Sequence, residues 1–305
     1  VILTDDLNLS VIKFKYDKVL TVALSTKIDL KMLSSTLKVL NISQIKLVND
    51  KHFFILLNTG EFYFLKRQDD SSGDGSKTLF NLMLINHHIE FIGLTEIEEE
   101  VLYVFDGSAV LIYSVEQLVK VDDLPMQPII VRNDLEYFQP LLLNVSFNSK
   151  SNKSINLLGL ENFNSLRGDK FLQLKTRVNH KHILNDFIEY YIVNKDDAKI
   201  ELLQKRFENF NYSLELLLFK YLTNFDIKTD AALADQLLEY IMKLINNTTL
   251  PETIYINCLR KIEVDYWPKF FETLKTTPLE FMNKLIDNGN EELCHNYLII
   301  YLNFK

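Results

Sequence analysis

Histidine and cysteine are the residue types in this sequence best suited to bind a metal ion. His180 and His182 stand two positions apart before a predicted helix, so they cannot share one helix face as a metal-binding pair spaced by four residues does. His87 and His88 are neighbours at the end of a predicted strand and would point to opposite sides of it. No cysteine pair stands near either histidine pair, and we therefore expect no metal site.

The sequence also lacks the short motifs of common catalytic sites. It contains no Gly-x-Ser-x-Gly turn, no phosphate-binding loop ending in Lys-Ser/Thr and no dinucleotide fingerprint. All three motifs require closely spaced glycines, and the chain has only eight glycines. Cys258 and Cys294 both lie on apolar faces of predicted helices, which favours buried thiols in a reducing compartment. We predict neither an active site nor a cofactor.

The most distinctive stretch is the last fifth of the chain, where helix signals follow one another closely. Helices are predicted over 251–263, 266–274 and 278–287, and another opens at 290–292. Trp267 begins an apolar stripe at helical spacing, and Pro268 suits the first turn of a helix, so Trp267 is predicted to anchor the core. Short helices that each need neighbours on both sides are typical of an α-solenoid.

Three motifs of this stretch resemble the C-terminal signature of the ribosome-control-one family. They are, in order, Cys258-Leu259-Arg260-Lys261-Ile262-Glu263, Trp267-Pro268 and Tyr297-Leu298-Ile299-Ile300. A weaker resemblance continues upstream in Tyr212-Ser213-Leu214-Glu215-Leu216-Leu217. The sequence departs from the family pattern at Leu259, Ile262 and Asn296.

The resemblance implies the large subunit of a Golgi exchange factor that activates Rab-six-type GTPases, the Ypt-type GTPases of yeasts. It further implies a smaller partner subunit with an arrestin-like fold, peripheral attachment to Golgi membranes, and a role in retrograde endosome-to-Golgi traffic. We assign the structural part of the signature to Cys258, Trp267, Pro268, Tyr297, Leu298 and Ile299.

Arg260, Lys261 and Glu263 have two readings. They follow the apolar residues of their helix and would project toward solvent or toward the next helix pair. In the first reading Arg260 or Lys261 caps or forms a salt bridge with a neighbouring helix, and in the second the three residues contact a partner protein. Both readings stay open at this point.

Composition sets the outer limits on the kind of protein. A chain of 305 residues with 47% hydrophobic residues can form more than one core, so two domains are expected. The net charge of −8 and a pI near 5.4 argue against nucleic acid as the main partner.

We see no signal leader and no apolar run near the roughly 18 residues that span a bilayer. Because the chain starts at Val1 and stops inside a predicted helix at Lys305, we expect a fragment of a longer protein. We expect this protein to be cytoplasmic.

The first half of the chain has the two-residue period of strands. Two predicted hairpins, turning at Asn58-Thr59-Gly60 and at Asp106-Gly107, place Gly60 and Gly107 47 residues apart, close to the ~40–50 residues of a propeller blade. Further hairpins are expected around Asp5-Asp6 and 149–153. Strand-like runs lie between the hairpins, at 19–24, 27–33, 37–42, 79–85 and 89–94.

We predict that residues 1–170 are the C-terminal blades of a larger WD40-like β-propeller, with an all-β sandwich as the alternative. The Ser, Gly and Asp cluster at 69–76 is read as an inter-strand loop, since it lacks the ligand spacing of a calcium loop.

The composition changes near residue 168, where helical periodicity replaces strand periodicity. A last strand is expected over 171–178, and we assign residues 171–305 to the α-solenoid domain. Four more helices are predicted over 182–193, 196–207, 212–223 and 230–245, which makes about eight in all. The predicted fold class is therefore α+β multidomain, a propeller end followed by an α-solenoid.

These predictions favour a binding protein over an enzyme. We expect a subunit of a guanine-nucleotide exchange factor that works by stabilising the nucleotide-free GTPase, which requires no covalent catalysis. The alternative is a propeller–solenoid scaffold of a vesicle coat or tethering complex, because a fold does not fix a function. An enzyme with an unfamiliar site is the third and least favoured class.

Overall fold

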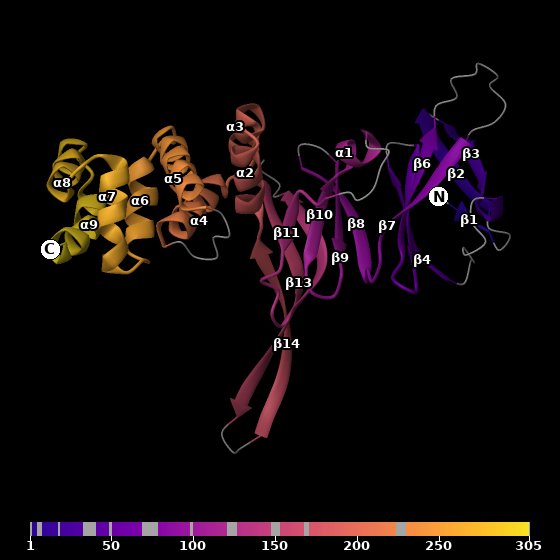
Figure 1. Ribbon diagram of the computed structural model, residues 1–305, viewed down its shortest axis with the longest axis horizontal. Coiled ribbons are helices and arrows are strands. Elements are labelled where there is room, and N and C mark those ends of the chain that lie inside the picture. The colour runs from indigo at the N-terminus through magenta and orange to yellow at the C-terminus, as the bar shows by residue number, and fades with distance from the viewer. Residues whose placement is uncertain are drawn as a thin grey trace. The chain divides into compact units, whose positions relative to one another are not determined.

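The computed structural model divides into a strand-rich and a helix-rich unit (Figure 1). It describes residues 2–4, 8–17, 19–32, 41–48, 51–68, 79–97, 100–120, 127–147, 153–167, 171–223 and 230–304. The first unit comprises Val1–Leu143 and Leu158–Asn179, and the second comprises Asn144–Leu157 and His180–Lys305. We describe each unit by itself.

Two four-stranded antiparallel sheets form the middle of the strand-rich unit. The first contains β4 (Ile42–Val48), β5 (His52–Leu57), β6 (Phe62–Gln68) and β7 (Leu79–Asn86), and the second contains β8 (Phe91–Glu96), β9 (Glu100–Phe105), β10 (Val110–Ser114) and β11 (Ile130–Arg132). Gly60 and Gly107 lie in the equivalent turn of each sheet, between its second and third strands, with φ of 89° and 86°. This backbone conformation favours glycine, so the 47-residue spacing marks a true structural repeat.

The sheets stack because β5 is apolar on both of its faces. All six residues of β5 are buried. Phe54 and Leu56 pack with residues of β9, whereas Phe53, Ile55 and Leu57 pack with Leu9 and Ile28 of a preceding sheet. Since alternate residues of a strand point to opposite faces, the four-stranded sheet formed by β4 to β7 is covered on both sides.

That preceding sheet contains β1 (Ile2–Leu3), β2 (Asn8–Asp17) and β3 (Val19–Asp29). The sequence predicted two strands, over 19–24 and 27–33, where the structure has the single strand β3 and a 3-10 turn, η1 (Leu30–Met32). No glycine or proline separates the two runs, and β2 pairs with β3 along its length through one bulge at Val11 and Ile12. The two-strand prediction was wrong for this reason.

A further sheet has the strand order β12 (Phe138–Phe147), β13 (Lys153–Arg167) and β14 (Phe171–His182). The expected domain border at residues 170 and 171 therefore falls between two paired strands, and the helices start only after β14.

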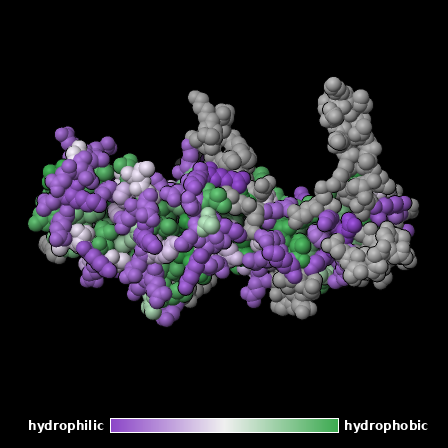
Figure 2. Space-filling model, turned by 90° about the horizontal axis from the view of Figure 1, so that it is seen from above, coloured by the Kyte–Doolittle hydropathy of each residue, from purple (hydrophilic) through white to green (hydrophobic). Residues whose placement is uncertain are grey.

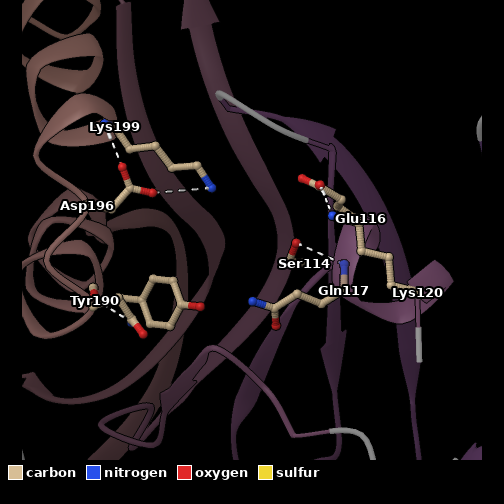
Figure 3. Close-up of polar contacts among 8 residues, drawn as sticks. Ser114, Glu116, Gln117, Lys120, Tyr190, Asp196 and Lys199 are labelled. Atoms are coloured by element: carbon tan, nitrogen blue, oxygen red, sulfur yellow. Dashed lines mark hydrogen bonds and ion pairs between the residues drawn. The ribbon is translucent and has the colours of Figure 1, made fainter. Parts of the chain in front are cut away.

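The short helix α1 (Val115–Lys120) was not predicted from the sequence. Within it, Glu116 and Lys120 form an ion pair four residues apart (Figure 3).

Several predicted features fall on residues that the structure does not describe. These are the turn at Asp5-Asp6, most of the run 37–42, the cluster at 69–76 and the turn at 149–152. The described sheets are compatible with propeller blades, but they do not form a closed propeller among the residues described.

The helix-rich unit contains the eight predicted helices, α2 to α9. Their bounds are α2 (Leu184–Val193), α3 (Asp197–Arg206), α4 (Phe210–Thr223), α5 (Ala231–Asn246), α6 (Pro251–Leu259), α7 (Trp267–Leu274), α8 (Pro278–Asp287) and α9 (Glu291–Asn303). They follow one another as a row in Figure 1. Helices α4, α5 and α6 each pack on earlier and later helices, as α4 does on α2, α5 and α6.

Local signals explain where most of these helices start. Asp196 caps α3 by accepting a hydrogen bond from the backbone N–H of Lys199 at 3.2 Å, and its carboxylate also pairs with the Lys199 ammonium (Figure 3). Thr277 and Glu280 form a reciprocal capping box at the start of α8, where Pro278 occupies the first turn. These starts agree with the predicted ones to within two residues.

The end of α6 differs from the prediction. The helix was expected to continue to residue 263 but ends at Leu259. The N–H of Lys261 bonds to the carbonyl of Cys258, three residues back, and a 3-10 turn, η3 (Val264–Tyr266), follows. This tightening places Arg260, Lys261 and Glu263 in the connection between α6 and α7 rather than on a helix face.

Candidate partner-binding site

The histidines singled out in the sequence do not form a metal centre. The described residues contain no group of three His, Cys, Asp or Glu side chains placed to hold a metal ion. His182 is instead part of a polar network, with Nε2 2.8 Å from Ser213 Oγ and Nδ1 3.1 Å from Asn209 Nδ2. This network joins the end of β14 to α4, which gives His182 a structural role.

The two cysteines differ in their environment. Cys258 is completely buried, and burial raises the pKa of its thiol to about 12. Such a thiol is protonated and unreactive at neutral pH. Cys294 is only half-buried, so the expectation of two buried thiols does not hold for it.

Lys261 forms an ion pair that connects two of the signature motifs. Its Nζ lies 2.5 Å from Oε1 of Glu215, a residue of the upstream motif on α4. The Glu215 side chain is 9% exposed and the Lys261 side chain 58% exposed, so the pair reaches from the helix interface to the surface. The hydrogen bond to Glu215 raises the pKa of Lys261 above its usual value. Lys261 therefore matches the first reading, a salt bridge to a neighbouring helix.

Arg260 and Glu263 are the other two candidate contact residues, and they flank Lys261 in the sequence. Arg260 is exposed and donates a hydrogen bond of 3.2 Å to Oδ1 of Asn296 on α9. Glu263 is exposed and precedes η3, beside the exposed Val264 and Asp265. Of the three candidate contact residues, Glu263 has its side chain at the surface of a turn, and the other two connect helices.

Trp267 and Pro268 begin α7, and Trp267 is 5% exposed. Its indole N–H donates a hydrogen bond of 3.1 Å to the carbonyl of Leu259, the last residue of α6. This bond satisfies one of the carbonyl groups that a helix end leaves without an intrahelical partner. Trp267 thus fixes the connection between α6 and α7 by both burial and hydrogen bonding.

The motif on α9 is divided between core and surface. Tyr297 is fully buried and its hydroxyl donates a hydrogen bond of 3.0 Å to the carbonyl of Pro278. Leu298 is 41% exposed and Ile299 58% exposed, so neither is a core residue. On this helix the face with Tyr297 and Ile300 is turned inward, and Leu298 and Ile299 lie outside that face. Figure 2 shows hydrophobic residues at the surface of the end of the unit where α8 and α9 lie.

Ion pairs between helices that are not successive in the chain were not foreseen from the sequence. Besides Lys261 and Glu215, they join Lys220 to Glu189, Lys284 to Glu252 and Lys269 to Asp235. Burial and hydrogen bonding to Glu189 strongly raise the pKa of the Tyr221 hydroxyl. In all four pairs the partners are 31 to 46 residues apart in the sequence, with Lys261 and Glu215 the farthest apart. Helical periodicity carries no information over such distances.

The buried residues and ion pairs described above hold the helices together. The connection between α6 and α7 and the outer face of α9 remain available for binding. The fold and the site therefore define a protein of stacked antiparallel sheets followed by an α-solenoid, with surfaces suited to protein contacts.

The family model described as RIC1 C-terminal alpha solenoid region matches residues 182–305. This match supports the ribosome-control-one family, as the resemblance of the three motifs indicated. Among curated proteins, none matches the chain. No helix of the described residues is both long enough and apolar enough to cross a bilayer.

Proposed function

We propose that this protein is a subunit of a guanine-nucleotide exchange factor complex for a Rab-type GTPase. The observation that supports the proposal is the family match over 182–305, which covers α2 to α9. The proposal includes a GTPase of the Rab-six or Ypt type, a smaller arrestin-like subunit, and a peripheral place on Golgi membranes in retrograde traffic. We also propose that the stacked sheets are blades of a WD40-like β-propeller.

An exchange factor of this kind acts by differential binding. It favours nucleotide release because it binds the nucleotide-free GTPase more tightly than the nucleotide-bound one. Moving a two-state equilibrium from 1:99 to 99:1 requires a preference of about 10⁴-fold for the favoured state. A rigid array of helices linked by ion pairs is suited to this task, since little order has to be created on binding.

The direct test is a nucleotide-release assay. The chain is combined with its smaller subunit, and release of a fluorescent GDP analogue is followed for a panel of Rab proteins. We expect accelerated release from the Rab-six or Ypt-type GTPase and the intrinsic rate from the others. Intrinsic rates for every GTPase would refute the proposal.

A scaffold of a vesicle coat or tethering complex is the second candidate. The order of the elements, stacked sheets followed by an α-solenoid, favours it independently of the family match. Affinity purification from cells separates the two candidates. Recovery of coat or tether subunits, together with no effect on nucleotide release, would support the scaffold.

A further inference from the structure

A groove of about 360 Å³ lies where α7 ends and α8 begins. Two proline and two phenylalanine side chains, Pro268, Phe271, Pro278 and Phe304, contribute to its lining. All of them belong to the helix-rich unit. The volume is at the lower end of the range of ligand-binding clefts, and it is large enough for one or two side chains of a peptide.

The walls of this groove are held in place by specific backbone interactions. Lys275 closes α7 in the left-handed conformation, with φ of 56°, and the N–H of Thr276 bonds back to the carbonyl of Phe271. The capping box of Thr277 and Glu280 then fixes the first turn of α8. Because the shape does not depend on a ligand, binding there costs little ordering of the protein.

Phe304 forms part of the aromatic lining of the groove. It follows α9 in an extended conformation, with φ of −76° and ψ of 113°. Its ring meets Phe271 edge-to-face, with centroids 5.1 Å apart and an interplanar angle of 82°. Phe271 and Phe304 thus form an aromatic pair in the groove lining, and edge-to-face contact is a favoured geometry for a further ring.

The charges around the groove favour a positively charged neighbour. Glu272, Lys275 and Glu280 line it and are exposed, which gives two carboxylates and one ammonium group. Hydrogen bonds from the backbone N–H and the side chain of Thr277 lower the pKa of Glu280, so this carboxyl group is ionised at neutral pH. The rim therefore carries net negative charge beside an apolar floor.

We propose that this groove binds an extended segment of a partner protein that carries an aromatic side chain next to an arginine or lysine. The aromatic ring packs on Phe271 and Phe304, and the basic group pairs with Glu272. The proposal concerns a peptide site and does not depend on nucleotide-exchange activity.

The probe is a fluorescein-labelled peptide, Gly-Ser-Arg-Phe-Arg-Ser-Gly, titrated with the chain and followed by fluorescence anisotropy. Two control peptides replace the phenylalanine by alanine or both arginines by glutamate. We expect each replacement to weaken binding at least about tenfold, because one removes the aromatic contact and the other places like charges together. Binding of the arginine peptide should also weaken as salt increases.

The variant Glu272→Lys reverses one charge on the rim and leaves the apolar floor unchanged. We expect about fivefold weaker binding of the arginine peptide and tighter binding of the glutamate peptide. Glu239→Lys on α5 is the matched control, since it makes the same change at an exposed position outside the groove lining, and it should leave both affinities unchanged. Melting temperatures of the two variants check that both are folded.

Two results would overturn the proposal. The first is an affinity for the arginine peptide that is the same in the parent, Glu272→Lys and Glu239→Lys proteins, or no binding at millimolar concentration. The second is sedimentation showing that the groove is occupied by a second copy, as a dimer that Glu272→Lys dissociates.

Discussion

At the residue scale, Trp267 combines burial with a hydrogen bond to the end of α6. We expect Trp267→Ala to lower the free energy of unfolding by about 3–5 kcal/mol, the usual cost of deleting a large buried aromatic side chain. Trp267→Phe keeps much of the buried area but leaves the Leu259 carbonyl without its donor, and it should cost about 1–3 kcal/mol. Denaturant unfolding and partner binding, measured on the same samples, provide the check. An unchanged unfolding curve with the loss of one partner would mean that Trp267 is a contact residue.

The ion pair between Lys261 and Glu215 decides between the two readings of the signature residues. Lys261→Met leaves a buried carboxylate without its ammonium partner, and we expect a loss of about 1–2 kcal/mol, less than for a fully buried pair because Lys261 is largely exposed. The double variant with Glu215→Leu should recover most of this loss, since it removes the unpaired charge.

Arg260→Ala is the control for this experiment, because Arg260 is exposed and makes one hydrogen bond to Asn296; its effect should be within about 0.5 kcal/mol. The pKa of Lys261 is raised, so the stabilisation is complete at neutral pH and is lost only as the pH rises above about 10.4, through the pKa of the folded state. A Lys261→Met protein as stable as the parent would argue for the partner-contact reading instead.

At the scale of the element, the capping box fixes where α8 begins. Thr277→Ala should cost about 1 kcal/mol, because the N–H of Glu280 loses its acceptor at the helix start. The neighbouring change Thr276→Ala should have a smaller effect, since the Thr276 hydroxyl lies 3.4 Å from the Glu280 carboxylate and caps no backbone group. Chemical denaturation of both variants measures the difference, and equal effects would contradict the assigned role.

The same capping box predicts a pH dependence. The pKa of Glu280 is lowered in the folded state, so its contribution is present above the pKa of the unfolded chain, about 4.3, and is lost as the pH falls through the folded value. Glu280→Gln should therefore make the stability decline less steeply with pH below about 4.5. Parallel acid-unfolding curves for the parent and the variant would contradict this expectation.

At the scale of the whole molecule, the proposed exchange activity should require the smaller subunit. The sequence contains no Gly-rich phosphate loop, and the described residues contain no group of side chains placed to hold a metal ion. We expect the chain alone to leave GDP release at the intrinsic rate and the two-subunit complex to accelerate it. Full activity of the isolated chain in the same release assay would contradict this prediction.

The sequence by itself determined the order of the two units, the eight helices and the repeated turns at Gly60 and Gly107. These features depend on local rules: apolar residues three and four positions apart, prolines and capping residues at helix starts, and glycine where φ is positive. The start of α8 at Pro278 is an example, because Thr277 and Glu280 specify it within four residues.

Only the tertiary structure decided which side chains meet and which helix faces stay at the surface. Lys261 finds Glu215 46 residues earlier, and Leu298 and Ile299 are exposed although they lie in an apolar run. The early end of α6 and the uninterrupted strand β3 also depend on contacts that periodicity does not encode, although their partners are near in the sequence: the indole of Trp267 and the adjacent strand β2. Periodicity specifies that a face is apolar, whereas packing against a particular neighbour determines whether that face is buried.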